Sequence, residues 1–362
     1  MSLNRRKFIK KSGLLLGASL LPYQNIFAHN NTKPLGVCLV ALGGYSTNVL
    51  APALQLTKYC KLTAIVTGTP SKIPIWQKKY GIKDSNVYHY ENIHEIANNP
   101  EIDVVYIVLP TGMHAEYAIK AADAGKHVWC EKPMAKTVEE CQAIIDACTK
   151  NNVKLTIGYR MHHEPNTQTV MDWAKTKPYG NIKTVKAEIG YNVKNVQRTW
   201  RTDKKLGGGT MYDLGVYALN GARYATAEEP ISVSAKQMTT RPDIFTETDE
   251  TTHFTLEFPS GIIANCKTSV GHNMHELKID CENGWYQLTP FSMYSGVGGK
   301  TSDGKLLNKY IENQQAQQMD DDALAIINNT DVMVPGEEGL KDIRIVEAIY
   351  KSAKEDGKLI SL

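Results

Sequence analysis

The chain has 362 residues, of which 42% are hydrophobic and 22% charged, and its net charge is +3 at neutral pH. Residues 1–28 carry five positive charges and no acidic residue, so the rest of the chain has a net charge near −2 (+3 minus 5). The length allows two domains with sizeable cores. A composition this ordinary, with almost no net charge, gives no sign of nucleic acid or another polyanion as a partner.

The N-terminus has the pattern of a twin-arginine export signal. Arg5 and Arg6 are followed by Lys7 and by a modest apolar run at 14–21. That run is far shorter than the roughly 20 residues that cross a bilayer, so a removable signal is favoured over an anchor. The sequence predicts that residues 1–28 are cleaved near Ala28. The mature protein would then lie in the periplasm, or otherwise outside the cytoplasm, with no membrane segment.

A strand, a glycine turn and a helix open the mature chain. The continuous apolar run 35–42 is typical of a buried parallel strand, and it ends in Gly43, Gly44 and Tyr45 before a predicted helix at 47–59. This order is that of a dinucleotide-binding fingerprint, although a plain strand–helix turn would look the same. Two positions depart from the usual glycine spacing, Ala41 and Ser46.

The second strand, predicted at 61–67, bears on the choice of nucleotide. A carboxylate near the end of this strand usually binds the ribose 2′-hydroxyl of NAD. Here Thr67, Gly68 and Thr69 are followed by Lys72, with hydroxyls and one cation but no carboxylate. Such groups suit a 2′-phosphate, so the sequence favours NADP and leaves NAD possible.

Further strands are predicted at 102–110, 127–130 and 153–160, with helices between them. The strand at 127–130 ends in Glu131-Lys132-Pro133, which places Lys132 where open α/β sheets bind their ligands. The same tripeptide is also a common surface turn. Alternation of strands and helices from 35 to 160 predicts a Rossmann-type doubly wound parallel sheet.

After residue 157 the pattern changes to β-rich segments, which predict a C-terminal α+β domain with a large, mostly antiparallel, open-faced sheet. A long excursion at 197–224 interrupts it, and 291–310 reads as a flexible loop. Within the excursion, Asp213 and Tyr217 are four residues apart on a predicted helix and share one face. The expected division is a signal at 1–28, a nucleotide-binding domain at 29–157 and a substrate and oligomerisation domain at 158–362.

The seven cysteines are scattered, mostly within apolar runs, and none of their spacings suggests a metal site. Buried free thiols are the favoured interpretation, although an oxidising compartment could pair some of them.

The motifs together resemble one enzyme family. They are Ile107–Pro110 with His114-Ala115-Glu116, Gly125–Met134, Ile157–Arg160, Trp200-Arg201, Gly207–Asn220, Gln318-Met319-Asp320 and Pro335–Gly339. The chain resembles the glucose–fructose oxidoreductase / inositol dehydrogenase family over nearly its whole mature length, and is most similar to the family's periplasmic glucose–fructose branch. Glu131-Lys132-Pro133 is the family signature. The loop after Trp200 and residues 239–250 match less well, and these are the stretches where sugar choice could be decided.

The resemblance implies roles for particular residues. Lys132 matches the active-site lysine, and Asp213 and Tyr217 match the catalytic helix, where most members have histidine in place of Tyr217. Tyr217 would accept the hydroxyl proton; because a free tyrosine has a pKa of about 10, it needs a nearby cation such as Lys132. Expected cofactor contacts are Gly43, Gly44, Tyr45, Thr67, Gly68, Thr69, Lys72, Leu109, Pro110, His114, Glu131, Lys132 and Arg160. Expected sugar contacts are Tyr159, His163, Trp200 and Arg201, each of which could equally serve packing.

The function expected from these observations is NADP-dependent hydride transfer between an aldose or other cyclic sugar and a nicotinamide that can stay bound. Two alternatives stay open: an NAD-dependent redox-assisted glycosidase, and a non-catalytic sugar or nucleotide sensor. The open face of the second sheet is expected to pair with another copy of the chain, giving a homodimer or homotetramer.

Overall fold

The computed structural model describes residues 33–362, so the predicted export signal lies outside the described residues. The first sheet is parallel throughout, in the order β3-β2-β1-β4-β5-β6. Its strands are β1 (Leu35–Val40), β2 (Cys60–Val66), β3 (Val87–Tyr88), β4 (Val104–Ile107), β5 (His127–Cys130) and β6 (Leu155–Ile157). The helices along this part are α2 (Ala51–Ala53), α3 (Ile73–Tyr80), α4 (His114–Asp123) and α5 (Val138–Lys150). This is the predicted Rossmann-type sheet.

Apolar residues cover both faces of that sheet. In β1, Val37 and Leu39 belong to one buried cluster with Trp76, whereas Cys38 and Val40 belong to the other. Two-sided burial explains why the strand reads as a continuous apolar run rather than an alternating one. The helix predicted at 47–59 is shorter than expected: a π-turn, η1 (Ser46–Leu50), leads into α2, which ends at Ala53.

The second sheet has the order β14-β13-β12-β11-β7-β10-β9-β8-β15 and is antiparallel except for the parallel pair β7 and β10. Its strands are β7 (Ile182–Gly190), β8 (Ser232–Met238), β9 (Thr251–Glu257), β10 (Ile263–Ser269), β11 (Met274–Cys281), β12 (Gly284–Leu288), β13 (Gly299–Thr301), β14 (Leu306–Leu307) and β15 (Ile360–Ser361). The helices of this part are α6 (Pro165–Thr176), α7 (Val216–Thr226), α8 (Gln314–Ile327) and α9 (Gly336–Lys354). The stretch 291–310, predicted as loop, contains the two short strands β13 and β14. The α/β plus α+β fold class is confirmed.

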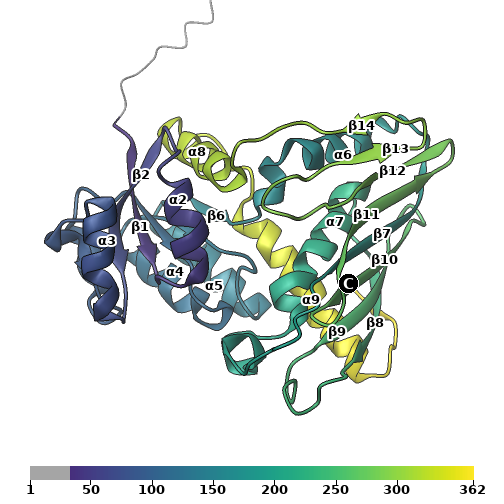
Figure 1. The fold of residues 1–362 in the computed structure, drawn as a ribbon, viewed down its shortest axis with the longest axis horizontal. Coiled ribbons are helices and arrows are strands. Elements are labelled where there is room, and N and C mark those ends of the chain that lie inside the picture. The colour runs from purple at the N-terminus through teal and green to yellow at the C-terminus, as the bar shows by residue number, and fades with distance from the viewer. Residues whose placement is uncertain (1–32) are drawn as a thin grey trace, which may run out of the picture. The chain divides into compact units, whose positions relative to one another are not determined.

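Figure 1 shows α7 and α9 against one face of the second sheet, with no described helix against the other. The open face carries charged residues such as Lys186, whose ammonium lies 3.0 Å from Glu188 and 2.8 Å from Glu276. Pairing of this face with another subunit stays a prediction. The domain boundary predicted after residue 157 falls at the end of β6.

Helix α8 is distant in sequence from the first sheet but packs on it. Ala316, Met319 and Ala323 join the buried cluster of Leu39. The carboxylate of Asp320 accepts hydrogen bonds from the backbone N–H groups of residues 58 and 59, which fastens α8 to the start of β2. Figure 1 shows this helix above the parallel sheet. Gln314, at the start of α8, accepts from Arg160, which follows β6, so the helix reaches from the start of β2 to the carboxyl end of β6.

All seven cysteines are free and buried. Among residues 33–362 no cluster of side chains has the make-up of a metal site, and no helix is long and apolar enough to cross a membrane.

Candidate active site

The glycine turn after β1 is shaped for the close approach of a ligand. Ala41 has φ +75°, in the left-handed region that glycine usually fills, and the hydroxyl of Ser46 donates to its carbonyl at 2.6 Å. A Cβ added at Gly43 would meet no atom within 4 Å, and at Gly44 only the Asn48 amide at 4.0 Å. The backbone here is open on one side at a helix start, which fits the pyrophosphate of a dinucleotide.

The loop after β2 is fastened to this turn. Lys72 closes a short 3₁₀ turn, η2 (Pro70–Lys72), and its ammonium donates to the carbonyl of Leu42 at 2.6 Å. Thr67 is buried and accepts from the backbone N–H of Thr69 at 3.1 Å. Gly68 and Thr69 are exposed. The predicted ribose-side residues therefore gather beside the glycine turn, with one cation among them.

His114 joins two loops that follow neighbouring strands. Its ring nitrogens lie 2.7 Å from the carbonyl of Leu109 and 2.9 Å from that of Pro133, and burial lowers its pKa. A neutral imidazole has one N–H, so only one of these contacts is a donated hydrogen bond. His114 thus holds the loop after β4, which contains Leu109 and Pro110, against the Glu131-Lys132-Pro133 turn.

Glu131 fixes the backbone next to the lysine instead of facing a ligand. Its buried carboxylate accepts from the Tyr106 hydroxyl at 2.7 Å and from the backbone N–H of Lys132 at 3.2 Å. Burial raises the pKa of Glu131, while Tyr106 and Lys132 oppose that shift. A Cβ at Gly158 would lie 2.9 Å from the Glu131 carboxylate, so this position, directly after β6, has no room for a side chain.

Lys132, Asp213 and Tyr217 come together in the structure, and Asp213 contacts Lys132 through its main chain. The Lys132 ammonium donates to the main-chain carbonyl of Asp213 at 2.6 Å and lies 4.7 Å from the centre of the Tyr217 ring. The Asp213 carboxylate instead pairs with Arg201, Oδ2 to Nε 2.9 Å. Because the Asp213 carboxylate is paired with Arg201, the Lys132 ammonium is positioned by the Asp213 carbonyl and by the face of the Tyr217 ring.

The helix that carries Asp213 and Tyr217 begins with a π-turn, η9 (Met211–Gly215), before it continues as α7. Such turns are rare and are frequent at functional sites. The Asp213 carbonyl that accepts from the Lys132 ammonium lies within this turn. Tyr217 follows in the first turn of α7 and is 8% exposed.

Arg160 lies inside the protein rather than in an open cofactor groove. Its guanidinium donates to the carbonyls of Ser292 and Met293 and to the side-chain oxygen of Gln314 on α8. The carbon Cζ is 5.2 Å from the centre of the Tyr217 ring and 4.7 Å from that of Tyr294. A buried cation therefore faces Tyr217 in addition to Lys132.

The loop that holds Arg160 also reaches the glycine turn. The rings of Tyr294 and Tyr45 have their centres 5.9 Å apart. Tyr294 and Gln314 were not predicted as site residues. Gln314 had a weak signal: together with Gln315, Gln318 and Asp322 it places polar residues on the buried side of the helix.

Three of the predicted sugar contacts lie apart from the Lys132–Tyr217 group. Tyr159 is 1% exposed, and burial and the nearby Asp342 raise its pKa. His163 is buried, with Nδ1 2.7 Å from the Asp321 carboxylate. Trp200 packs against Arg201, whose Cζ is 4.4 Å from the indole centre. Of the four, Arg201 alone contacts a predicted catalytic residue.

Asp322 is a buried residue of α8. We expect it to make the stability of the folded protein depend on pH. Burial raises the pKa of Asp322 from 3.8 to about 7, and His163 opposes the shift. The folded protein then keeps a proton that the unfolded chain loses above about pH 4, so stability falls from about pH 4 to 7 by up to about 4 kcal/mol. Asp322→Asn is expected to remove this fall.

Urea unfolding at pH 5 and pH 8 measures the effect. The matched control is Asp331→Asn, at an exposed position, which is expected to keep the wild-type difference between the two pH values. Equal pH dependence in wild type and Asp322→Asn would contradict the prediction.

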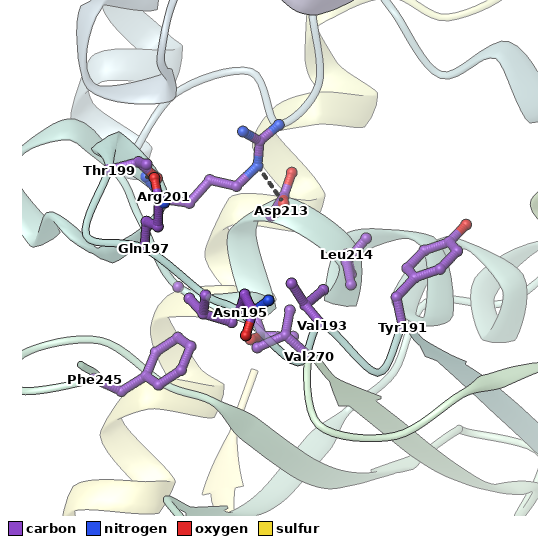
Figure 2. Close-up of a pocket in the computed structure, with 13 residues that line it drawn as sticks. Tyr191, Val193, Asn195, Gln197, Thr199, Arg201, Asp213, Leu214, Phe245 and Val270 are labelled. Atoms are coloured by element: carbon purple, nitrogen blue, oxygen red, sulfur yellow. Dashed lines mark hydrogen bonds and ion pairs between the residues drawn. The ribbon is translucent and has the colours of Figure 1, made fainter. Parts of the chain in front are cut away.

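A cavity of about 440 Å³ adjoins the catalytic helix (Figure 2). Its walls come from the segment 191–201, the start of η9, Phe245 and Val270. Sequence reasoning singled out none of the residues at 191–199 or Phe245, although 239–250 was marked as a stretch where sugar choice could be decided.

A glycine turn at a parallel sheet and a lysine–tyrosine pair at its carboxyl edge define a dinucleotide-dependent oxidoreductase. Residues 35–159 match the model of an oxidoreductase family with an NAD-binding Rossmann fold, and residues 167–287 match the GFO/IDH/MocA C-terminal domain. The chain therefore belongs to the GFO/IDH/MocA family of oxidoreductases, and the predicted family is confirmed.

Relatives extend over most of the chain. A crystal structure of aldose-aldose oxidoreductase from Caulobacter crescentus is 35% identical, covers 91% of this chain and 100% of its own, and has a TM-score of 0.87. D-xylose 1-dehydrogenase [NADP(+)] from Haloarcula marismortui is 25% identical over 90% of this chain and 92% of its own. Myo-inositol 2-dehydrogenase from Lactobacillus plantarum, 19% identical over 91% of this chain and 100% of its own with a TM-score of 0.77, shows the fold alone.

Proposed function

We propose that this protein oxidises the anomeric hydroxyl of an aldose by hydride transfer to NADP. The observation that carries the proposal is the contact of the Lys132 ammonium with both the Asp213 carbonyl and the Tyr217 ring at the edge of the parallel sheet. NADP is supported by the carboxylate-free loop at 67–72, by Lys72 beside the glycine turn, and by the NADP-dependent xylose dehydrogenase among the relatives.

The side chains divide the work of the reaction. A bound nicotinamide would supply the hydride acceptor. Lys132 holds the reacting oxygen, and Tyr217 takes the hydroxyl proton as the C1–H bond gives up its hydride and C1=O of the lactone forms. The proton acceptor is the phenolate of Tyr217, and the two cations that face its ring, Lys132 at 4.7 Å and Arg160 at 5.2 Å, stabilise that anion.

We further propose a closed cycle on an exported protein, as in the glucose–fructose branch. The twin-arginine pattern at Arg5 and Arg6 supports export. Free NADP is not expected outside the cytoplasm, so a nucleotide that stays bound would have to be reduced by one sugar and reoxidised by another. The Tyr294–Tyr45 contact, which joins the loop after β12 to the glycine turn, supports retention.

Purification without added nucleotide tests this proposal. The protein is expected to carry a nicotinamide that an aldose reduces, seen as new absorbance and fluorescence, and that a ketose or lactone reoxidises. Protein that is purified without a bound nucleotide and reduces only added NADP would indicate an ordinary sugar dehydrogenase instead of a closed cycle. A bound nucleotide that no sugar changes would reject the proposed chemistry in favour of a glycosidase or a sensor, and release of an aglycone without net redox change would single out the glycosidase.

A further inference from the structure

The cavity beside the catalytic helix has a size that the reacting group alone does not explain. Its volume of about 440 Å³ lies within the range of roughly 300–1,000 Å³ found for small-molecule sites. Neither Lys132 nor Tyr217 lies on its wall. It is therefore a separate space, next to the position where the reacting carbon must sit.

Asp213 joins the two spaces. Its main-chain carbonyl accepts the Lys132 ammonium at 2.6 Å, while its carboxylate lies on the cavity wall and pairs with Arg201 at 2.9 Å. Figure 2 shows Arg201 reaching across to Asp213 above the space lined by Asn195 and Val193. A ligand held at Lys132 would need to extend past only one residue to enter the cavity.

Tyr191 makes a second connection. It lines the cavity, and its hydroxyl lies 3.5 Å from the sulfur of Met293, whose carbonyl accepts from Arg160. Arg160 in turn faces the Tyr217 ring. The cavity wall is thus continuous with the groups around the proposed proton acceptor.

The lining suits a neutral ring that has both hydroxyl groups and a carbon–hydrogen face. Its apolar part includes Leu214, Phe245 and Val270, and its polar part includes the side-chain amides of Asn195 and Gln197. Such a mixture of apolar walls and few polar groups is usual where specificity is needed. The charged residues on the wall, Arg201 and Asp213, neutralise each other, which disfavours an ionic guest.

We propose that this cavity is a second sugar subsite, and that the substrate is an aldose that carries a further ring, such as a reducing disaccharide. The reacting unit lies at Lys132 and Tyr217, and the second ring lies beyond Asp213, against Phe245 and between the amides of 195 and 197. This inference rests on the proposed aldose oxidation and adds the substrate class to it.

The test compares kcat/KM for D-glucose, cellobiose and maltose in wild type and in two variants of the same loop. Asn195→Trp fills the cavity; Asn192→Trp makes the same change at an exposed position that is not on its wall. One of the disaccharides is expected to exceed glucose by about tenfold in wild type, and Asn195→Trp to lose that preference by about the same factor. Asn192→Trp is expected to keep the wild-type preference.

Two outcomes separate this inference from the proposed function. Oxidation of glucose with no preference for either disaccharide, or the same preference in Asn195→Trp as in wild type, would overturn the second subsite alone. If no sugar is oxidised, the proposed chemistry fails, and calorimetric titration of cellobiose into the three proteins decides the subsite. Binding weakened only in Asn195→Trp supports it, and equal or absent binding in all three rejects it.

Discussion

Replacing Lys132 with methionine is expected to lower the rate of nicotinamide reduction by an aldose about 1,000-fold while the protein stays folded. Methionine keeps an unbranched stem of similar length but loses the ammonium. The variant therefore cannot hold the reacting oxygen, and the Asp213 carbonyl loses the hydrogen bond that it accepts from the Lys132 ammonium at 2.6 Å. Stopped-flow fluorescence of the bound nicotinamide at saturating aldose measures the hydride step directly.

Lys136→Met is the matched control, since it makes the same change four residues further on. The Lys136 ammonium donates to the carbonyl of Lys205 at 3.1 Å and has no contact with the Tyr217 ring. Wild-type rates are expected for this control. If Lys132→Met kept more than about a tenth of the wild-type rate, the lysine would not carry the reaction.

The order of elements and the position of Lys132 could be predicted because local patterns determine both. A buried parallel strand reads as an uninterrupted apolar run, and a ligand site at the carboxyl edge of such a sheet follows from topology alone. Two apolar runs mark such strands and the sites that follow them: 127–130 before Lys132, and 35–42 before Gly43. The spacing of Asp213 and Tyr217 likewise placed them on one helix.

The parts that escaped prediction depend on contacts between distant segments. The resemblance implies that Arg160 contacts the cofactor, and its neighbours in the sequence do not indicate that its guanidinium is held by the carbonyls at 292 and 293 and by Gln314 on α8. Nothing local in the sequence shows that a late helix returns to the first sheet. The Asp213 carbonyl that accepts from Lys132 lies in a π-turn, and no residue pattern in the sequence distinguishes that turn from an α-helix.

The cavity had only an indirect signal. Its wall combines the segment 191–199, the start of η9 and Phe245, which lie in three stretches of the sequence. Each stretch is unremarkable by itself, because amides, threonines and valines are common in loops. Only the fold shows that they surround one space beside Asp213.

Removing the Tyr217 hydroxyl is expected to have the second largest effect. Tyr217→Phe should lower the rate of the hydride step by about 100- to 10,000-fold, because the ring keeps its contacts with Lys132 and Arg160 but can no longer accept a proton. Tyr217→His should recover part of the rate, since a neutral imidazole accepts a proton, and the recovered rate should fall below about pH 6.5 as the ring becomes charged. The pH profile of single-turnover reduction measures both effects.

A matched substitution on the same helix separates chemistry from packing. Tyr224 is also buried on α7, and its hydroxyl has no hydrogen-bond partner within residues 33–362, so Tyr224→Phe removes an equivalent group without touching Lys132 or Arg160. This control is expected to keep the wild-type rate. Should Tyr217→Phe also keep it, the proton must leave by another route, such as water, and the two cations would then act on the sugar oxygen alone. Loss in Tyr217→Phe with no recovery in Tyr217→His would instead indicate that the position of the phenol oxygen matters as much as its ability to accept a proton.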